Sequence, residues 1–291
     1  MFEIALEQNQ YKTYSLVNKV THSSMTIIPE RGGIVTSWVV NGQEVFYLDQ
    51  ERFKNAALSV RGGIPLLFPI CGNLPNDTYA YQAQTYQLKQ HGFGRTSPWD
   101  VTHQSTLENE ARLTITLKSN EATQAVYPFE FALDYTYVLK DNVLELHQRH
   151  TNLSDRPMPF STGIHPYFSV QDKSKLTFDI PANQYQIKGA AERHSFDGSF
   201  DFSQDEIDFS FVELQGTTST VIDNGSNRKL TLEFDSKYST LVFWTLADKA
   251  FYCLEPWTGP RNAINTGKDL LTIAPGKTVE TKVIMRIDSL A

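Results

Sequence analysis

Apolar and polar residues alternate with a period of two along most of the chain. Residues 112–118 read RLTITLK, residues 229–234 read KLTLEF, and residues 279–287 read VETKVIMRI. Successive side chains of a β-strand point to opposite faces of a sheet, so this alternation predicts strands with one buried face. Strands of this kind are typical of antiparallel sheets.

Turn residues separate the predicted strands. Asn41-Gly42 lies between SWVV and QEVFYL, residues 140–142 (KDN) lie between YTYVL and VLELH, and Pro275-Gly276 precedes the last predicted strand. Each of these predicts a hairpin or a tight reversal. In residues 131–139 and 241–246 both the odd-numbered and the even-numbered positions are largely apolar. This pattern is typical of strands that are covered on both faces.

Helical periodicity is scarce. Residues Glu51 to Leu58 can form about two turns, and no β-α-β alternation is visible. The pattern therefore predicts an all-β protein, a large antiparallel β-sandwich, in which residues 1–291 form a single domain without a linker. Residues 190–203 are rich in Ser, Asp, Gly and Phe and predict a long excursion, and long ordered loops on a β scaffold often line binding sites.

Composition and charge narrow the function classes. The 291 residues are 12% aromatic and 20% charged, with a formal net charge of −7 and no basic run. This balance argues against nucleic acid or an anionic membrane as a partner. The longest apolar run, Ile64 to Cys71, contains two prolines and is too short to cross a bilayer, and the first residues show no signal-peptide pattern. We therefore expect a cytoplasmic protein.

Four segments interrupt the alternation with glycine, proline, aromatic and ionisable residues. They are RGGIPLLFPICGN (61–73), HGFGR (91–95), GIHPYF (163–168) and FYCLEPWTGP (251–260). In the first, an arginine beside two glycines can grip an oxygen-rich ligand or form a structural turn. In the last, Glu255 ends an apolar strand, where desolvation should raise its pKa towards that of a useful general base.

The histidines and cysteines leave further alternatives. His91 and His165 each lie among glycine, proline and rings, which suits either a structural role or acid–base chemistry. His147 and His150 follow a strand-like segment, where a three-residue offset places them on opposite faces and disfavours a metal pair. The cysteines, Cys71 and Cys253, are expected as buried free thiols, with a bridge or a reactive thiol as the alternatives.

Taken together and in this order, the four segments resemble the aldose 1-epimerase family of the galactose mutarotase-like superfamily. RGGIPLLFP with HGFGR resembles the branch that contains hexose-6-phosphate mutarotases, and HPYF, LEPWTGPRNAINTG and APGKT extend the resemblance from about Trp38 to Ile287. It implies a large antiparallel β-sandwich that interconverts the α and β anomers of an aldose without a metal or an organic cofactor.

The resemblance also implies roles for individual residues. Glu255 matches the family's general base, and His165 matches its general acid. His91 and, more weakly, Asp208 match substrate-binding positions. Further expected substrate contacts are Arg61, Arg95 and Asn73, and the rings of Phe93, Tyr167 and Trp257 are expected to shape a sugar pocket.

The expected partner is therefore a small-molecule sugar, a hexose or a hexose phosphate, bound by a monomer or a homodimer. Three other functions stay open: hexose-6-phosphate 1-epimerase, glycoside hydrolysis by the carboxylates Glu255 and Asp208, and a carbohydrate-binding module without turnover.

Overall fold

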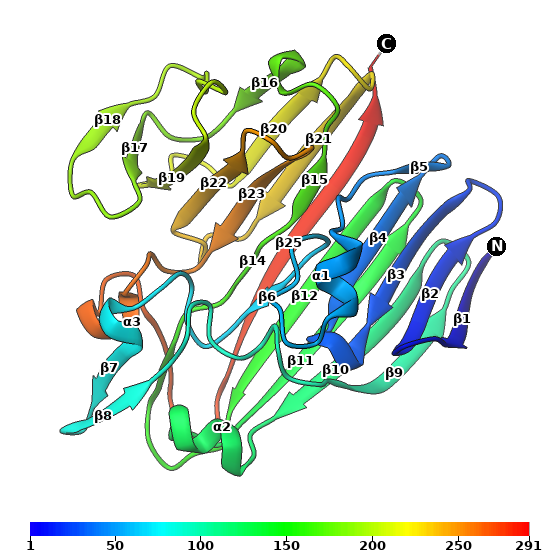
Figure 1. Cartoon of the computed structure of the whole chain (residues 1–291). Coiled ribbons are helices and arrows are strands. Elements are labelled where there is room, and N and C mark those ends of the chain that lie inside the picture. Colours follow the sequence, from blue (N-terminus) through cyan, green and yellow to red (C-terminus); the bar gives the residue numbers. More distant parts are fainter. Residues whose placement is uncertain (291) are drawn as a thin grey trace.

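Strands dominate the computed structural model, which describes residues 1–290 (Figure 1). They form three larger antiparallel sheets, here called the N-terminal sheet, the back sheet and the site sheet. The expectation of an all-β antiparallel sandwich is confirmed. None of the helices in this range is long and apolar enough to span a membrane.

The sheets have the following strand orders and bounds. The N-terminal sheet runs in chain order through β1 (Phe2–Gln8), β2 (Lys12–Asn18), β3 (Ser23–Ile28), β4 (Ile34–Val40) and β5 (Gln43–Glu44). The back sheet is ordered β16 (Leu176–Asp179), β20 (Thr218–Asp223), β21 (Arg228–Phe234), β25 (Thr278–Ser289), β12 (Val143–Asn152), β11 (Phe131–Lys140), β10 (Ala111–Lys118) and β9 (Asp100–Thr106). The site sheet is ordered β18 (Arg193–Ser195), β17 (Gln184–Ile187), β19 (Glu206–Val212), β22 (Thr240–Leu246), β23 (Phe251–Trp257), β14 (Gly163–Ile164) and β6 (Leu66–Leu67), and β15 (Tyr167–Ser169) also pairs with β23.

Shorter elements complete the chain. Two small sheets pair β7 (Thr78–Tyr81) with β8 (Gln84–Gln87) and β13 (Met158–Phe160) with β24 (Leu271–Ile273). The α-helices are α1 (Gln50–Lys54), α2 (Glu121–Val126) and α3 (Ala263–Thr266), and single 3-10 turns form at 29–31, 75–77 and 173–175. Helices therefore contribute little to the core.

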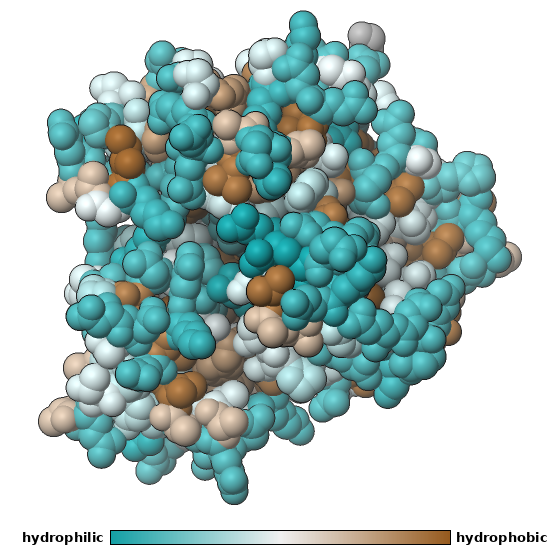
Figure 2. Space-filling model, viewed as in Figure 1, coloured by the Kyte–Doolittle hydropathy of each residue, from teal (hydrophilic) through white to brown (hydrophobic). Residues whose placement is uncertain are grey.

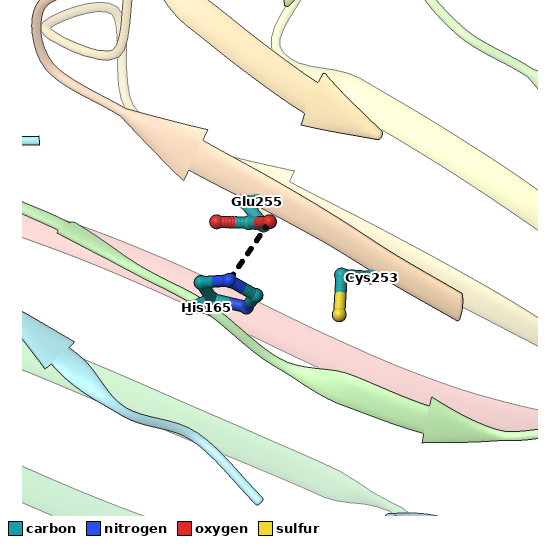
Figure 3. Close-up of side chains that lie close together, drawn as sticks. All are labelled: His165, Cys253 and Glu255. Carbon is teal, nitrogen blue, oxygen red and sulfur yellow. Dashed lines mark ion pairs between the residues drawn. The ribbon is translucent and has the colours of Figure 1, made fainter. Parts of the chain in front are cut away.

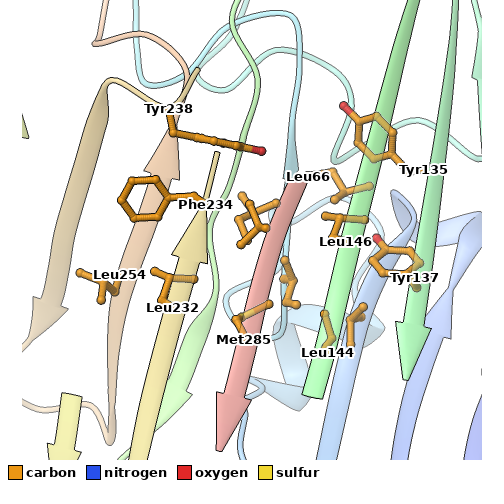
Figure 4. Close-up of a cluster of buried hydrophobic side chains, with 14 of the residues drawn as sticks. Leu66, Tyr135, Tyr137, Leu144, Leu146, Leu232, Phe234, Tyr238, Leu254 and Met285 are labelled. Carbon is orange, nitrogen blue, oxygen red and sulfur yellow. The ribbon is translucent and has the colours of Figure 1, made fainter. Parts of the chain in front are cut away.

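One continuous apolar core joins the three larger sheets. It contains residues of the N-terminal sheet such as Ile27, of the back sheet such as Leu146 and of the site sheet such as Phe243. Figure 4 shows its centre, where side chains of β11, β12, β21 and β25 lie beside Leu66 of β6 and Leu254 of β23. The face seen in Figure 2 is mostly hydrophilic, with apolar residues in small separate patches.

The predicted alternation corresponds to the observed burial. In β25, Val283, Met285 and Ile287 are buried, and the residues between them are partly exposed. The predicted turns also form: Asn41 and Gly42 both have positive φ between β4 and β5, which is the geometry of a type I′ hairpin turn.

Two local predictions need correction. The helix expected over residues 51–58 ends at Lys54, because Asn55 adopts an extended conformation with ψ of 104°. The carbonyls of Asn55, Ala56 and Leu58 accept hydrogen bonds from the guanidinium of Arg31. The excursion over residues 190–203 includes β18, and its Phe200 stacks on Phe243 with ring centroids 3.7 Å apart. It thus packs into the core, and its residues do not line the cavity described below.

Gly63 brings the segment after Arg61 against β4. Its φ is +58°, and a Cβ at this position would lie 1.9 Å from the carbonyl oxygen of Val35. Only glycine therefore allows this contact, which also includes a hydrogen bond from the amide of Ile64 to the same oxygen.

We expect Gly63→Ala to lower the free energy of unfolding by about 3 kcal/mol or more, measured by urea denaturation, because positive φ and a backbone clash combine. Gly276→Ala is the matched control: Gly276 has φ of +66° with nothing within 4 Å of its Cβ position. The control should lose roughly 1–2 kcal/mol from positive φ alone. Equal losses in the two variants would show that the approach to Val35 does not require glycine.

Candidate active site

The register of the site sheet gathers polar side chains on its outer face. Tyr252 and Leu254 of β23 belong to the core, so the alternate residues Cys253, Glu255 and Trp257 face away from the back sheet. Strand pairing extends this face across the sheet: Cys253 pairs with Tyr167 and Trp244, and Trp244 pairs with Asp208. Cross-strand partners share a face, so four strands contribute to one surface.

A cavity of about 270 Å³ lies on this surface. It is lined by five basic residues (Arg52, Arg61, Arg95, Lys188 and Arg261), three acidic residues (Glu206, Asp208 and Glu255), two histidines (His91 and His165) and three rings (Tyr167, Trp244 and Trp257). The volume is close to the lower end of ligand pockets, roughly 300 Å³, and suits a single sugar ring better than an oligosaccharide.

Glu255 and His165 form a buried pair in this cavity. Nε2 of His165 lies 3.3 Å from Oε1 of Glu255, and the two residues are 8% and 1% exposed (Figure 3). His165 follows β14, its amide donates to the carbonyl of Pro65, and its ring stacks on Tyr167 at 4.7 Å. The indole Nε1 of Trp257 donates to the other oxygen of Glu255 at 3.2 Å. Both side chains are therefore held in place.

Burial and charge shift both pKa values of the pair. Burial, followed by the charge of Asp208, raises the pKa of Glu255 well above its usual range, while Arg261, Trp257 and Arg95 act in the opposite direction. Burial, followed by the charge of Arg95, lowers the pKa of His165 to about 3. Both shifts favour the uncharged form of the residue. The pair therefore holds one shared proton, which lies on Glu255, and carries no net charge.

His91 contributes a second fixed imidazole. It sits at φ of +66° before Gly92, and its Nδ1 accepts a hydrogen bond from the amide of Gly72 at 3.1 Å. Burial and the charge of Arg95 lower its pKa well below the usual value. The ring is therefore neutral with its proton on Nε2, and the side-chain amide of Gln90, which also lines the cavity, lies 3.2 Å from this atom.

Asp208 is held by two cations. Nη2 of Arg261 lies 2.6 Å from one carboxylate oxygen of Asp208, and Nζ of Lys188 lies 3.1 Å from the other. Arg261 also donates to Ser210 at 2.6 Å and lies 5.1 Å from the ring of Trp257. Because both oxygens of Asp208 are occupied, this carboxylate is poorly suited to act as the acid of a glycosidase.

The guanidinium groups of Arg95, Arg61 and Arg52 form no ion pair with a carboxylate within 4.0 Å among residues 1–290, although all three residues line the cavity. Arg95 is the most enclosed of the three. Its Nη2 donates a hydrogen bond to the carbonyl of Gln90, and its buried Nε has no hydrogen-bond partner in the described chain. Arg61 lies 5.8 Å from the ring of Trp244. Positive charge without a nearby counter-charge favours an anionic ligand.

Six predicted site residues thus meet in one cavity: Glu255, His165, His91, Asp208, Arg61 and Arg95. Asn73 does not line it: this residue is exposed, after the turn at Gly72 where φ is +76°. Tyr167 and Trp257 line the cavity as expected, whereas Phe93 packs between Phe68 and Phe131.

Sequence reasoning missed Arg52, Lys188, Trp244 and Arg261. Arg261 lay within the LEPWTGPRNAINTG motif, and strand pairing with Asp208 is the only signal for Trp244. Both cysteines are buried and free, and His147 contacts Glu145 while His150 is buried beside Tyr135, so these two histidines form no metal pair.

The chain matches the family model described as aldose 1-epimerase over residues 12–286. A crystal structure of a protein from Synechocystis sp. PCC 6803 is 42% identical, with a TM-score of 0.94 over 99% of this chain and 100% of that one. A galactose mutarotase-like protein from Clostridium acetobutylicum, 22% identical, has a TM-score of 0.85 over 99% of each chain and shows the shared fold. A relative from Cenchrus ciliaris with the provisional name glucose-6-phosphate 1-epimerase is 24% identical over 75% of this chain and 66% of its own length.

Arg261 acts on both carboxyl groups of the cavity: it forms an ion pair with Asp208 and lowers the pKa of Glu255. We expect Arg261→Met to raise the pKa of Glu255 further, because a positive charge is lost and Asp208 is left less compensated. The measurement is a ¹³C NMR titration of labelled glutamate carboxyls, with Glu255→Gln used to assign the signal. Arg149→Met, outside the cavity, is the control and should change nothing. An unchanged or lower pKa in Arg261→Met would contradict this account.

Proposed function

The chain belongs to the aldose 1-epimerase family, and we propose that it interconverts the α and β anomers of a hexose through Glu255 and His165. The observation that carries the proposal is the buried contact between Nε2 of His165 and Oε1 of Glu255 in a cavity of single-sugar size. A carboxyl group and an imidazole at this distance can exchange protons with two oxygens of one bound ring.

The reaction needs only two proton transfers and one bond cleavage. The carboxylate of Glu255 takes the proton from the anomeric hydroxyl, whose oxygen forms the aldehyde C=O as the bond from C1 to the ring oxygen breaks. The imidazolium of His165 gives its proton to the ring oxygen. After rotation about the C1–C2 bond, the ring closes on the other face of C1 with the two roles exchanged, and the anomer is released.

The shared proton of the buried pair fits this cycle. At rest, burial keeps this proton on Glu255 beside a neutral His165, so ring opening starts from the tautomer in which the proton has moved across the 3.3 Å contact to His165. After ring opening the pair is again carboxylic acid and neutral imidazole. Both states have no net charge, so the cavity never has to hold an isolated charge. Burial favours the carboxylic acid and the neutral imidazole, whereas Arg95 and Arg261 favour the ionised carboxylate but disfavour the imidazolium.

Other cavity residues support substrate binding in this proposal. A sugar oxygen can replace the side-chain amide of Gln90 and accept the Nε2 proton of His91, and the guanidinium of Arg261 keeps Asp208 in position. Tyr167, Trp244 and Trp257 supply apolar faces against which a sugar ring can pack. Since no electron transfer is involved, the reaction requires no redox cofactor.

A hexose 6-phosphate is the second candidate substrate. It is favoured by the three arginines without a carboxylate partner in the described chain, above all by the enclosed Arg95. A phosphate group would supply the missing counter-charge and accept paired hydrogen bonds from guanidinium groups.

We expect Glu255→Gln and His165→Ala each to lower kcat/KM for anomer exchange by roughly 10²–10⁴-fold, because each removes one proton-transfer group. The measurement is polarimetry of a freshly dissolved single anomer, with circular dichroism to show that the fold is retained. Glu280→Gln and His147→Ala, outside the cavity, are the matched controls. Full activity in either cavity variant would refute the assigned role, and saturable sugar binding without any exchange would favour a carbohydrate-binding module instead.

Substitution of Arg95 and Arg61 distinguishes the two candidate substrates, the hexose and the hexose 6-phosphate. If the phosphate ester is the substrate, Arg95→Met and Arg61→Met should raise KM at least tenfold more for the hexose 6-phosphate than for the free hexose, because only the ester carries an anionic group. NMR exchange rates for both sugars provide the measurement. Equal effects on the two substrates would count against the phosphate.

A further inference from the structure

Cys253 lies beside the Glu255–His165 pair and has no role in the proposed proton transfers. One ligating atom from each of the three residues, the thiol sulfur, an imidazole nitrogen and a carboxylate oxygen, lies within 4.8 Å of the others (Figure 3). Cys253 and Glu255 are two residues apart on β23 and therefore project from the same face. Sulfur, nitrogen and oxygen together form a typical donor set for Zn²⁺.

The spacing within the group is close to that of a metal site. Bonds of about 2.0 Å from a tetrahedral Zn²⁺ to nitrogen and to oxygen place these two atoms roughly 3.3 Å apart. Nε2 of His165 and Oε1 of Glu255 are separated by 3.3 Å. A bond of about 2.3 Å to sulfur requires Sγ to lie about 3.5 Å from each of them. In the structure the three ligand atoms lie within 4.8 Å of one another.

The imidazole also has unused capacity. Nδ1 of His165 is buried and has no hydrogen-bond partner among residues 1–290, although the residue is only 8% exposed. Buried ring nitrogens are normally satisfied, so the imidazole has one nitrogen without a partner while its other nitrogen faces Glu255.

We propose that Glu255, His165 and Cys253 form a binding site for one thiophilic divalent cation of the Zn²⁺ class, and that its occupation inhibits the enzyme. The inhibition part of this proposal rests on the proposed function, because the cation would occupy the lone pairs of Glu255 and His165 that receive and release protons. Binding does not rest on it, since it requires only the three donors. The cation enters through the cavity, which Glu255 and His165 line, and a water molecule from the cavity completes four ligands.

Arg61, Arg95 and Arg261 line the same cavity and would repel an added positive charge. Binding of the cation adds no net charge, however, because it releases protons. In the metal-free state the pair holds one proton and Cys253 is a neutral thiol, so the group carries no net charge. Binding of M²⁺ displaces both protons, which leaves one carboxylate, one thiolate and a neutral imidazole around a charge of +2. The net charge of the group is again zero, so the arginines lie beside the same net charge with and without the cation.

Co²⁺ tests the binding without any assay of activity. We expect Co²⁺ added to the purified protein to produce a thiolate-to-cobalt charge-transfer band that saturates at one equivalent and disappears on addition of Zn²⁺. Cys253→Ala should abolish the band, and Cys71→Ser should retain it, because Cys71 is the other buried cysteine but is not one of the three donors. No band, or an equal band in Cys253→Ala, would overturn the proposed site even if the enzyme is active.

Zn²⁺ inhibition tests the functional consequence. We expect micromolar Zn²⁺ to slow anomer exchange by the wild-type protein and by Cys71→Ser, with reversal by a chelator. Cys253→Ala and Cys253→Ser should each need at least tenfold more Zn²⁺ relative to their own uninhibited rates. Equal inhibition of all variants would overturn the assignment of Cys253. A cobalt band in a protein without epimerase activity would instead refute the proposed function and leave the metal site standing.

Discussion

The central constraint of this structure is that two buried ionisable groups must share one proton. Glu255 is 1% exposed and His165 is 8% exposed, so neither can be charged alone at low cost. Their 3.3 Å contact makes a neutral unit whose proton can move without changing the total charge. The surrounding side chains then tune the balance: Asp208 disfavours the carboxylate, and Arg95 and Arg261 favour it.

Strand register delivers the carboxyl half of this pair, and His165 lies in the two-residue connection between β14 and β15. Glu255, Trp257 and Cys253 come from one strand by simple alternation, and pairing adds Tyr167, Trp244 and Asp208. Loops supply mainly the positive charge, through Arg61 and Arg95, and these loops are fixed by tight backbone contacts. Gly63 against Val35 and the three bonds from Arg31 to residues 55, 56 and 58 are examples. The loop that carries Arg61 also supports the acid–base pair, because the carbonyl of its Pro65 accepts a hydrogen bond from the amide of His165.

The sequence predicted the strands and most of the cavity because both depend on local patterns. Period-two alternation fixes which face of β25 is buried, and unusual Gly, Pro and His motifs mark His91, His165 and Glu255. It could not predict contacts made by distant pairing. Trp244 enters the cavity only because β22 lies between β19 and β23, and Lys188 because it reaches Asp208. Asn73 and Phe93 sit inside marked motifs, but a local turn and core packing direct them elsewhere.

The position of β25 has a consequence for how the protein is made. Although it is the last strand along the chain, it lies in the middle of the back sheet, between β21 and β12. Until the ribosome has released β25, these two strands have no shared partner, and each has an open edge that is paired with β25 in the finished sheet. The two halves of the back sheet can therefore join only after β25 has been synthesised, and until then the edges of β12 and β21 are open to pairing with other chains.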